Sequence, residues 1–216
     1  MGRRGSESGY GAVAKTLHWL TVLAIAAQFA IGLSMDPGAA ADRADARVDA
    51  FEERGEQRAE DQGEAAEERF EAEVERREDA VDALEDSVGS QELRDVVSGQ
   101  ALRRGLTGVE LHVLVGLGVL LLGLARLLWR RVTPLPPWAE HLSAGERTFE
   151  AWLEKAMLGL LIVVPSTGLL LAVGSLDLLP LHVAAQVALV VTVVLHVGLV
   201  LKHTVVRRNR HLARML

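Results

Sequence analysis

Four long apolar stretches constrain the fold of this chain more than any other feature. Each approaches or exceeds the ~20 residues that an α-helix needs to cross the hydrocarbon core of a bilayer. The stretches are too long, and too rich in Leu and Ala, to be β-strands. The sequence therefore predicts an all-α fold, a bundle of four transmembrane helices, with spans at residues 16–35, 109–129, 151–173 and 181–206.

Charge is distributed unevenly along the chain. Residues 36–105 carry 22 acidic and 10 basic residues, a net charge of −12, in a chain whose total is −6. The remaining basic residues all fall on one side of the predicted bundle: Arg3, Arg4, Lys15, Arg126, Arg130, Arg131, Arg147, Lys155, Lys202, Arg207, Arg208, Arg210 and Arg214. Because cytoplasmic connections are enriched in Arg and Lys, we expect both termini to be cytoplasmic and the acidic segment to be extracytoplasmic. The expected location is the plasma or inner membrane, crossed several times.

The first apolar stretch has a second interpretation as a cleavable secretory signal. Arg3 and Arg4 precede it, and small residues follow it at positions 38–41. The stretch is long for a signal, however, and it contains a His18-Trp19 pair that a disposable segment does not need. These features favour a retained helix.

The acidic segment separates two parts of the membrane domain. We divide the chain into residues 1–35 with the first span, the acidic insert 36–105, and residues 106–216 with the other three spans and a cytoplasmic tail. Within the insert, apolar residues form only a thin helical stripe: Phe70, Val74, Val81, Leu84 and Val88. The pattern fits one long solvated helix, a loose helical hairpin that breaks near Gly55 or Gly63, or a disordered charged loop.

Histidines inside the apolar stretches are the candidate functional residues, because a polar side chain within a membrane must find a partner. Five of the seven lie there: His18, His112, His182, His196 and His203. The other two, His141 and His211, fall in polar segments and are interpreted as surface residues. The chain has no cysteine, which excludes thiolate metal sites and iron–sulfur clusters.

Helical spacing arranges these histidines in two layers. His182 and His196 are separated by about four helical turns, so they share a face of the fourth span and lie about 21 Å apart along its axis. His203 follows two turns later on that face. In the second span, Arg126 follows His112 at the same interval as His196 follows His182, with Gly116 and Gly123 between them leaving room for a flat ring.

Depth in the bilayer then suggests pairs of ligands. His112 and His182 both lie near the outer ends of their spans, whereas His18 lies near the inner end of the first span, opposite His196 or His203. Two imidazoles that face each other across a helical bundle can ligate a haem iron, and Arg126 is suited to a haem propionate. The alternatives are buried histidines that only hydrogen-bond to carbonyls, or a copper or zinc site, although such a site would need three or four converging ligands.

The ordered set of these residues resembles the bacterial cytochrome b561 family, which is related to the cytochrome b subunits of hydrogenases and formate dehydrogenases. The matching pieces are Leu17-His18-Trp19-Leu20, Leu111-His112 with Gly116, Ala125–Leu128 ending at Arg130, Pro165–Gly168, the histidines of the fourth span, and the basic tail 206–216. The resemblance implies two haems b, the inner ligated by His18 and His196 and the outer by His112 and His182. It leaves Arg126 and His203 as candidate propionate or quinone contacts.

Two features depart from the family pattern. The whole acidic insert 36–105 joins the first two spans, where the family usually has a short loop. Glu154-Lys155 stands where some members have a histidine at the start of the third span, which puts a quinone or proton site there in doubt.

The sequence thus predicts a di-haem membrane cytochrome that transfers electrons across the membrane, to or from quinone, either as a carrier or as a quinone-linked oxidoreductase. Expected partners are membrane lipid, a quinone or quinol, an extracytoplasmic redox partner and a second copy in a homodimer, but no nucleic acid. The alternative is a non-redox membrane anchor whose acidic segment recruits a partner.

Overall fold

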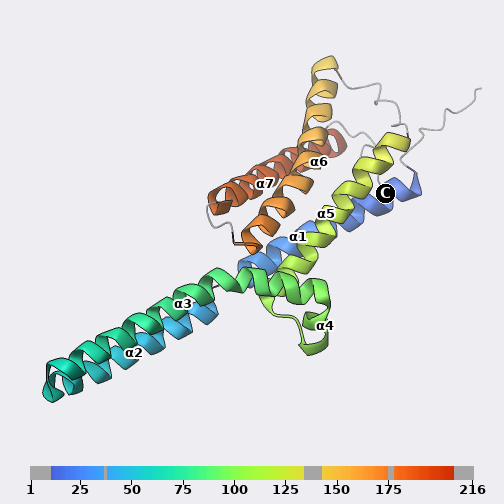
Figure 1. Ribbon diagram of the computed structural model, residues 1–216. Coiled ribbons are helices and arrows are strands. Elements are labelled where there is room, and N and C mark those ends of the chain that lie inside the picture. The colour runs from blue at the N-terminus through green and yellow to red at the C-terminus, as the bar shows by residue number, and fades with distance from the viewer. Residues whose placement is uncertain (1–10, 37, 134–142, 175–177, 207–216) are drawn as a thin grey trace, which may run out of the picture. The chain divides into compact units, whose positions relative to one another are not determined.

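The computed structural model describes residues 11–36, 38–133, 143–174 and 178–206 (Figure 1). The described part of the chain is helical throughout, with turns and no strand. Four helices are long and apolar enough to cross a membrane: α1 (Ala12–Ser34), α5 (Gly108–Val132), α6 (Ala144–Ala172) and α7 (Leu179–Leu201), which a π-helical turn η2 (Lys202–Val206) extends. The prediction of an all-α protein with four membrane spans is confirmed.

Large apolar side chains on these helices are exposed to their surroundings. Leu23, Leu121 and Val194 are each more than 60% exposed, although they lie in the middle of long apolar helices. In water such surfaces would drive association, whereas in a bilayer they contact lipid tails. The helices therefore fit a multi-pass membrane protein.

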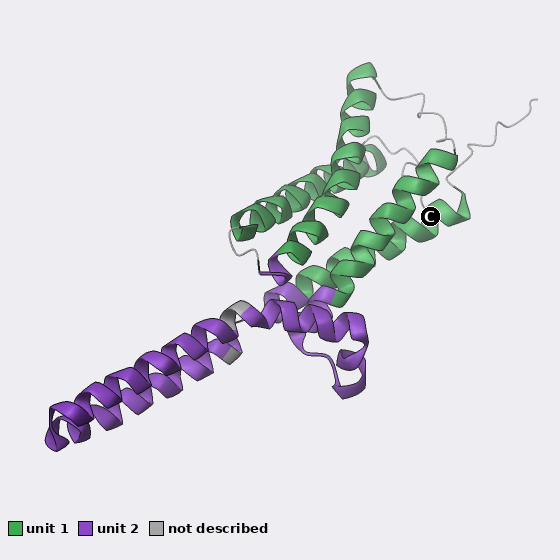
Figure 2. Ribbon diagram, in the orientation of Figure 1, with its two compact units in different colours: residues 1–30, 114–170, 176–216 green, residues 31–113, 171–175 purple. Residues whose placement is uncertain are grey.

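The chain divides into two compact units (Figure 2). Unit 1 comprises residues 1–30, 114–170 and 176–216, and therefore holds most of the four apolar helices. Unit 2 comprises residues 31–113 and 171–175, which include the acidic insert.

Within unit 1, close approaches at glycines set how neighbouring helices pack. A Cβ on Gly123 of α5 would lie 3.2 Å from the Leu161 carbonyl of α6 and 3.1 Å from Ile162 Cδ1. Gly123 therefore serves helix packing, and the prediction that it leaves room for a flat ring is wrong. Since Arg130 of α5 also pairs with Glu154 of α6, these two helices run antiparallel.

Two contacts at opposite ends align α6 with α7 in the same antiparallel way. Gly168 of α6 approaches His182 near the start of α7, and Glu150 near the start of α6 approaches His203 just after α7. Helix α6 continues through Pro165, as expected for a proline in a membrane span.

Within unit 2, residues 39–98 form a helical hairpin of α2 (Ala39–Gln62) and α3 (Glu64–Ser98), which lie side by side (Figure 1). The turn is at Gly63, whose φ of 97° is a conformation that glycine adopts without steric cost. Gly55 does not break α2. A Cβ there would overlap the ring of Phe70, which stacks on Phe51 at a centroid distance of 5.3 Å. The structure thus has the hairpin, one of the three arrangements that the sequence left open.

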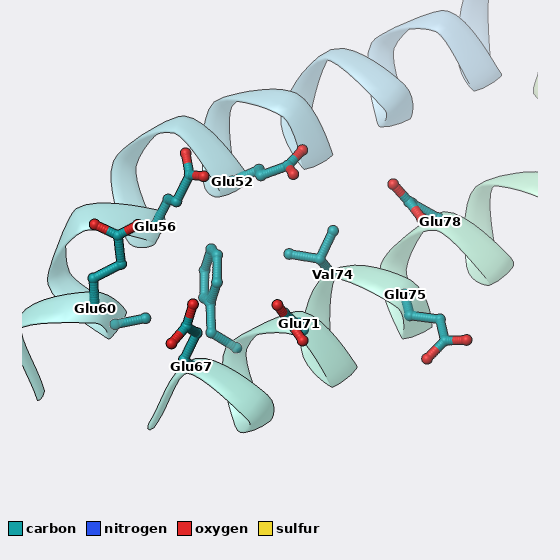
Figure 3. A pocket seen from close by; sticks show the side chains of 10 residues that line it. Glu52, Glu56, Glu60, Glu67, Glu71, Val74, Glu75 and Glu78 are labelled. Carbon is teal, nitrogen blue, oxygen red and sulfur yellow. The ribbon is translucent and has the colours of Figure 1, made fainter. Parts of the chain in front are cut away.

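Glutamates surround the apolar contact of this hairpin (Figure 3). Phe70, Val74 and Ala59 are among the residues that line a groove of about 300 Å³. Glu52, Glu56 and Glu60 of α2 line it together with Glu67, Glu71, Glu75 and Glu78 of α3. Arg77 lies over the Phe51 ring, 4.1 Å from its centroid. The stripe predicted from the sequence is therefore a narrow interface flanked by charge.

A capping box starts α5, after the short helix α4 (Gln100–Arg104). Thr107 Oγ1 accepts the backbone N–H of Glu110 at 3.1 Å, and Glu110 Oε2 accepts the backbone N–H of Thr107 at 2.9 Å. The Glu110 side chain is fully buried, and its Oε1 pairs with Arg104 at 2.6 Å. Ser143 and Glu146 form the same motif at the start of α6.

Candidate functional site: the histidines of the membrane helices

The five predicted histidines all lie in the described helices. His18 is on α1, His112 on α5, His182 and His196 on α7, and His203 in η2. His182 and His196 share one continuous helix, as their spacing requires. The surface assignments of His141 and His211 concern residues outside the described ranges.

His18, His196 and Arg126 come together within unit 1 from three different helices. The imidazoles of His18 and His196 interact electrostatically with each other, and each also interacts with the Arg126 guanidinium. The Nδ1 atom of His18 is buried and makes no hydrogen bond, while its ring meets Trp19 edge-on at 5.5 Å between centroids. This group, called the inner cluster below, contains both predicted inner ligands and Arg126, one of the two candidate propionate or quinone contacts.

His182 is held differently, by hydrogen bonds to one residue of α6 and one of α7 in unit 1. Its Nδ1 lies 2.9 Å from Thr167 Oγ1, and its Nε2 lies 2.7 Å from Gln186 Nε2. Gly168 lets the α6 backbone approach the ring, because a Cβ there would lie 3.0 Å from His182 Cε1. The His182 side chain is only 9% exposed and that of Thr167 only 6%.

His112 belongs to unit 2. The α1 backbone approaches it at Gly32, where a Cβ would lie 3.2 Å from His112 Cε1. His182 belongs to unit 1, so the pairing of these two histidines stays a prediction.

His203 is completely buried and pairs with a carboxylate. Its Nε2 lies 3.3 Å from Glu150 Oε1 of α6. The adjacent Lys202 binds Glu146 Oε1 at 3.1 Å, and Arg130 pairs with Glu154. Three glutamates on successive turns of α6 thus each face a basic side chain of a neighbouring segment.

Comparison with known proteins decides the family. A family model described as prokaryotic cytochrome b561 matches residues 9–216, nearly the whole chain. The chain belongs to this family. No curated protein and no solved structure was found to match it.

Membership fixes the general chemistry. Members of the cytochrome b561 family are membrane cytochromes that bind haem b and transfer electrons. The resemblance deduced from the ordered motifs is therefore confirmed, and so is the interpretation as a membrane cytochrome that followed from it.

The residues present in this cytochrome fit a haem better than a bare metal ion. The described residues contain no group of three or more His, Cys, Asp or Glu side chains that could hold an ion. Haem needs only two axial ligands, because its macrocycle supplies the other four. The His18 ring, whose buried Nδ1 makes no hydrogen bond, and the neighbouring His196 would suit such a pair, and a guanidinium beside them suits a carboxylate.

Three residues beside His182 were not recognised from the sequence as part of a site. Gln186 follows His182 by one helical turn and so shares its helix face, a spacing that could have identified it. Thr167 and Gly168 lie in the Pro165–Gly168 motif, but only the fold brings this motif to His182.

Proposed function

We propose that this protein is a di-haem cytochrome that carries electrons across the membrane, with the inner haem ligated by His18 and His196 and the outer by His112 and His182. The observation that carries the proposal is the inner cluster. Helices α1, α5 and α7, far apart in the sequence, bring two imidazoles and one guanidinium together inside an apolar bundle. Gathering these half-buried polar groups inside an apolar bundle would have no evident structural benefit without a ligand.

Spacing along the helices supports a second haem. On α7, His182 precedes His196 by about four helical turns, and on α5, His112 precedes Arg126 by the same interval. Both helices therefore carry a further histidine about 21 Å along the axis from the inner cluster. A pair at this second level would bring electrons across most of the ~30 Å hydrocarbon core.

Haem b supplies one-electron chemistry when bound, and the protein supplies ligation, low polarity and local charge. Arg126 would bind a propionate and offset its negative charge within the bundle. His18 and His196 would hold the iron from α1 and α7, two helices of unit 1.

The electron partner at the cytoplasmic end is proposed to be a quinone. The buried imidazole of His203 pairs with the partly exposed carboxylate of Glu150, and such a pair can accept and release the protons that quinone reduction and oxidation require. The charge distribution supports cytoplasmic termini in the plasma or inner membrane, with α2 and α3 outside, where a soluble redox partner would meet the protein. A homodimer is also expected.

Haem counting on single variants tests the assignment. The purified protein should contain two haems per chain by pyridine haemochrome assay. His18→Ala and His196→Ala should each lose one haem, and optical redox titration should show that the same midpoint potential disappears from both. His112→Ala and His182→Ala should each lose the other.

His203→Ala is the matched control, because it removes a third histidine of the same helical segment without removing a proposed ligand. It should keep both haems. If His203→Ala lost a haem while His196→Ala kept two, the ligand assignment would be wrong. A preparation of the unaltered protein with a single haem per chain would contradict the di-haem proposal.

A further inference from the structure

The hydrogen bonds around His182 determine which of its ring nitrogens carries the proton. The Thr167 hydroxyl lies 2.8 Å from the carbonyl oxygen of Val164 and 3.0 Å from that of Val163. A hydroxyl has one proton, and a carbonyl can only accept. Thr167 therefore donates to its own helix, and its oxygen accepts a hydrogen bond from His182 Nδ1.

The contact with Gln186 leads to the same tautomer. On the other side of the ring, the amide nitrogen of Gln186 can only donate, so Nε2 of His182 must offer its lone pair. Nδ1 is protonated and Nε2 is the nucleophilic nitrogen.

We propose that Thr167 is a positioning residue that holds His182 as the Nδ1–H tautomer, so that Nε2 is the nitrogen that would ligate the outer haem. The inference rests on the proposed function, in which His182 is an axial ligand. It adds which residue orients this ligand.

The two partners of the ring differ in how easily they can leave. Thr167 is buried, and its hydroxyl is tied to the α6 backbone, so it cannot follow a rotating ring. Gln186 is half-buried and has three rotatable side-chain bonds, so its amide can swing away at small cost. Thr167 is therefore the partner that fixes the orientation of the His182 ring.

A hydrogen bond from Nδ1–H to an acceptor raises the electron density of an axial imidazole and so stabilises the ferric state. Thr167→Val keeps the shape of the side chain but removes the acceptor. We expect it to raise one of the midpoint potentials in optical redox titration, to change the low-spin EPR signal of the same haem, and to leave two haems bound. Thr167→Ser should restore the original potential.

Thr192→Val is the matched control. Thr192 is also a buried threonine in a membrane span, but its hydroxyl donates only to the backbone of its own helix, to the Ala188 carbonyl at 2.6 Å. It should leave the potential of the haem affected by Thr167→Val unchanged. Gln186→Leu should keep both haems, because the amide is not a ligand.

The outcomes separate the inference from the proposed function. If His182→Ala kept both haems, His182 would not be a ligand, and both would fail. If His182→Ala lost one haem but Thr167→Val left both potentials and the EPR spectrum unchanged, the positioning role alone would be refuted. Loss of a haem in Gln186→Leu would contradict the inference, because Thr167 should then still hold the ring.

Discussion

A methyl group added at Gly168 tests how tightly the His182 ring is held. In Gly168→Ala, the new Cβ would lie 3.0 Å from His182 Cε1, 3.6 Å from Nδ1 and 3.7 Å from Nε2, whereas ordinary contacts of this kind begin at 3.4 Å. The ring or the α6 backbone must therefore move by a few tenths of an ångström. Thr167, the adjacent residue, binds the same ring at 2.9 Å, so the ring cannot retreat without lengthening that hydrogen bond.

The size of the effect follows from the cost of overpacking. Inserting a methyl group into a well-packed interior costs about 1–3 kcal/mol. If this strain falls on the ligated geometry, affinity for the outer haem falls between about fivefold and more than a hundredfold, since about 1.4 kcal/mol is a factor of ten. We therefore expect Gly168→Ala to retain one haem and to bind the second weakly in a titration with limiting haem.

Gly159→Ala provides the control on the same helix. A Cβ at Gly159 would meet nothing within 4 Å, so this variant shares the favourable helix propensity of alanine without the contact. It should bind both haems as the unaltered protein does. Equal haem affinity in the two alanine variants would refute the close packing of α6 on His182 as a determinant of ligation.

Three further predictions concern unit 2. Gly55→Ala should separate the tips of α2 and α3, because the new Cβ would overlap the Phe70 ring. Limited proteolysis should then cut the hairpin faster, and adding Phe70→Ala to the same chain should reverse part of this effect. Thr107→Ala removes the N-cap of α5 and should lower the free energy of unfolding by about 1 kcal/mol, measured by denaturant titration. Burial is the main cause that raises the pKa of Glu92, and a hydrogen bond with Thr107 opposes it. The folded protein therefore binds this proton more tightly than the unfolded chain does. The resulting contribution to stability is present at low pH and is lost as the pH rises through the raised pKa. Glu92→Gln should flatten this pH dependence of the melting temperature, and an unchanged slope would contradict it.

Hydropathy predicted the membrane helices well but missed where one of them begins. The third span was expected from residue 151, whereas α6 begins at Ala144. Its first two turns contain Glu146 and Glu150, which lower the hydropathy of any window that includes them. The Ser143–Glu146 capping box was present in the sequence as a Ser-x-x-Glu pattern and could have located this start.

The acidic insert was predictable in composition but not in arrangement. Its apolar stripe is too thin to distinguish a hairpin from a single helix, because both leave most side chains in solvent. Gly55 and Gly63 appeared equivalent as places where the helix breaks. In the structure, Gly63 supplies a positive φ and Gly55 a close approach to Phe70, two uses of a missing Cβ that a sequence alone does not separate.

His203 shows most clearly why side-chain partners could not be derived from spacing. A step of two turns from His196 placed it on the same face of an ideal α-helix, where it competed with His196 as a ligand. The chain instead passes into the π-helical turn η2 at Lys202, and π-turns wind more residues per turn than an α-helix. His203 is buried there against Glu150, a residue far earlier in the chain that hydropathy had left outside the third span. Because the partner is a carboxylate brought in by the antiparallel packing of α6 and α7, residue spacing within the fourth span alone could not have identified it.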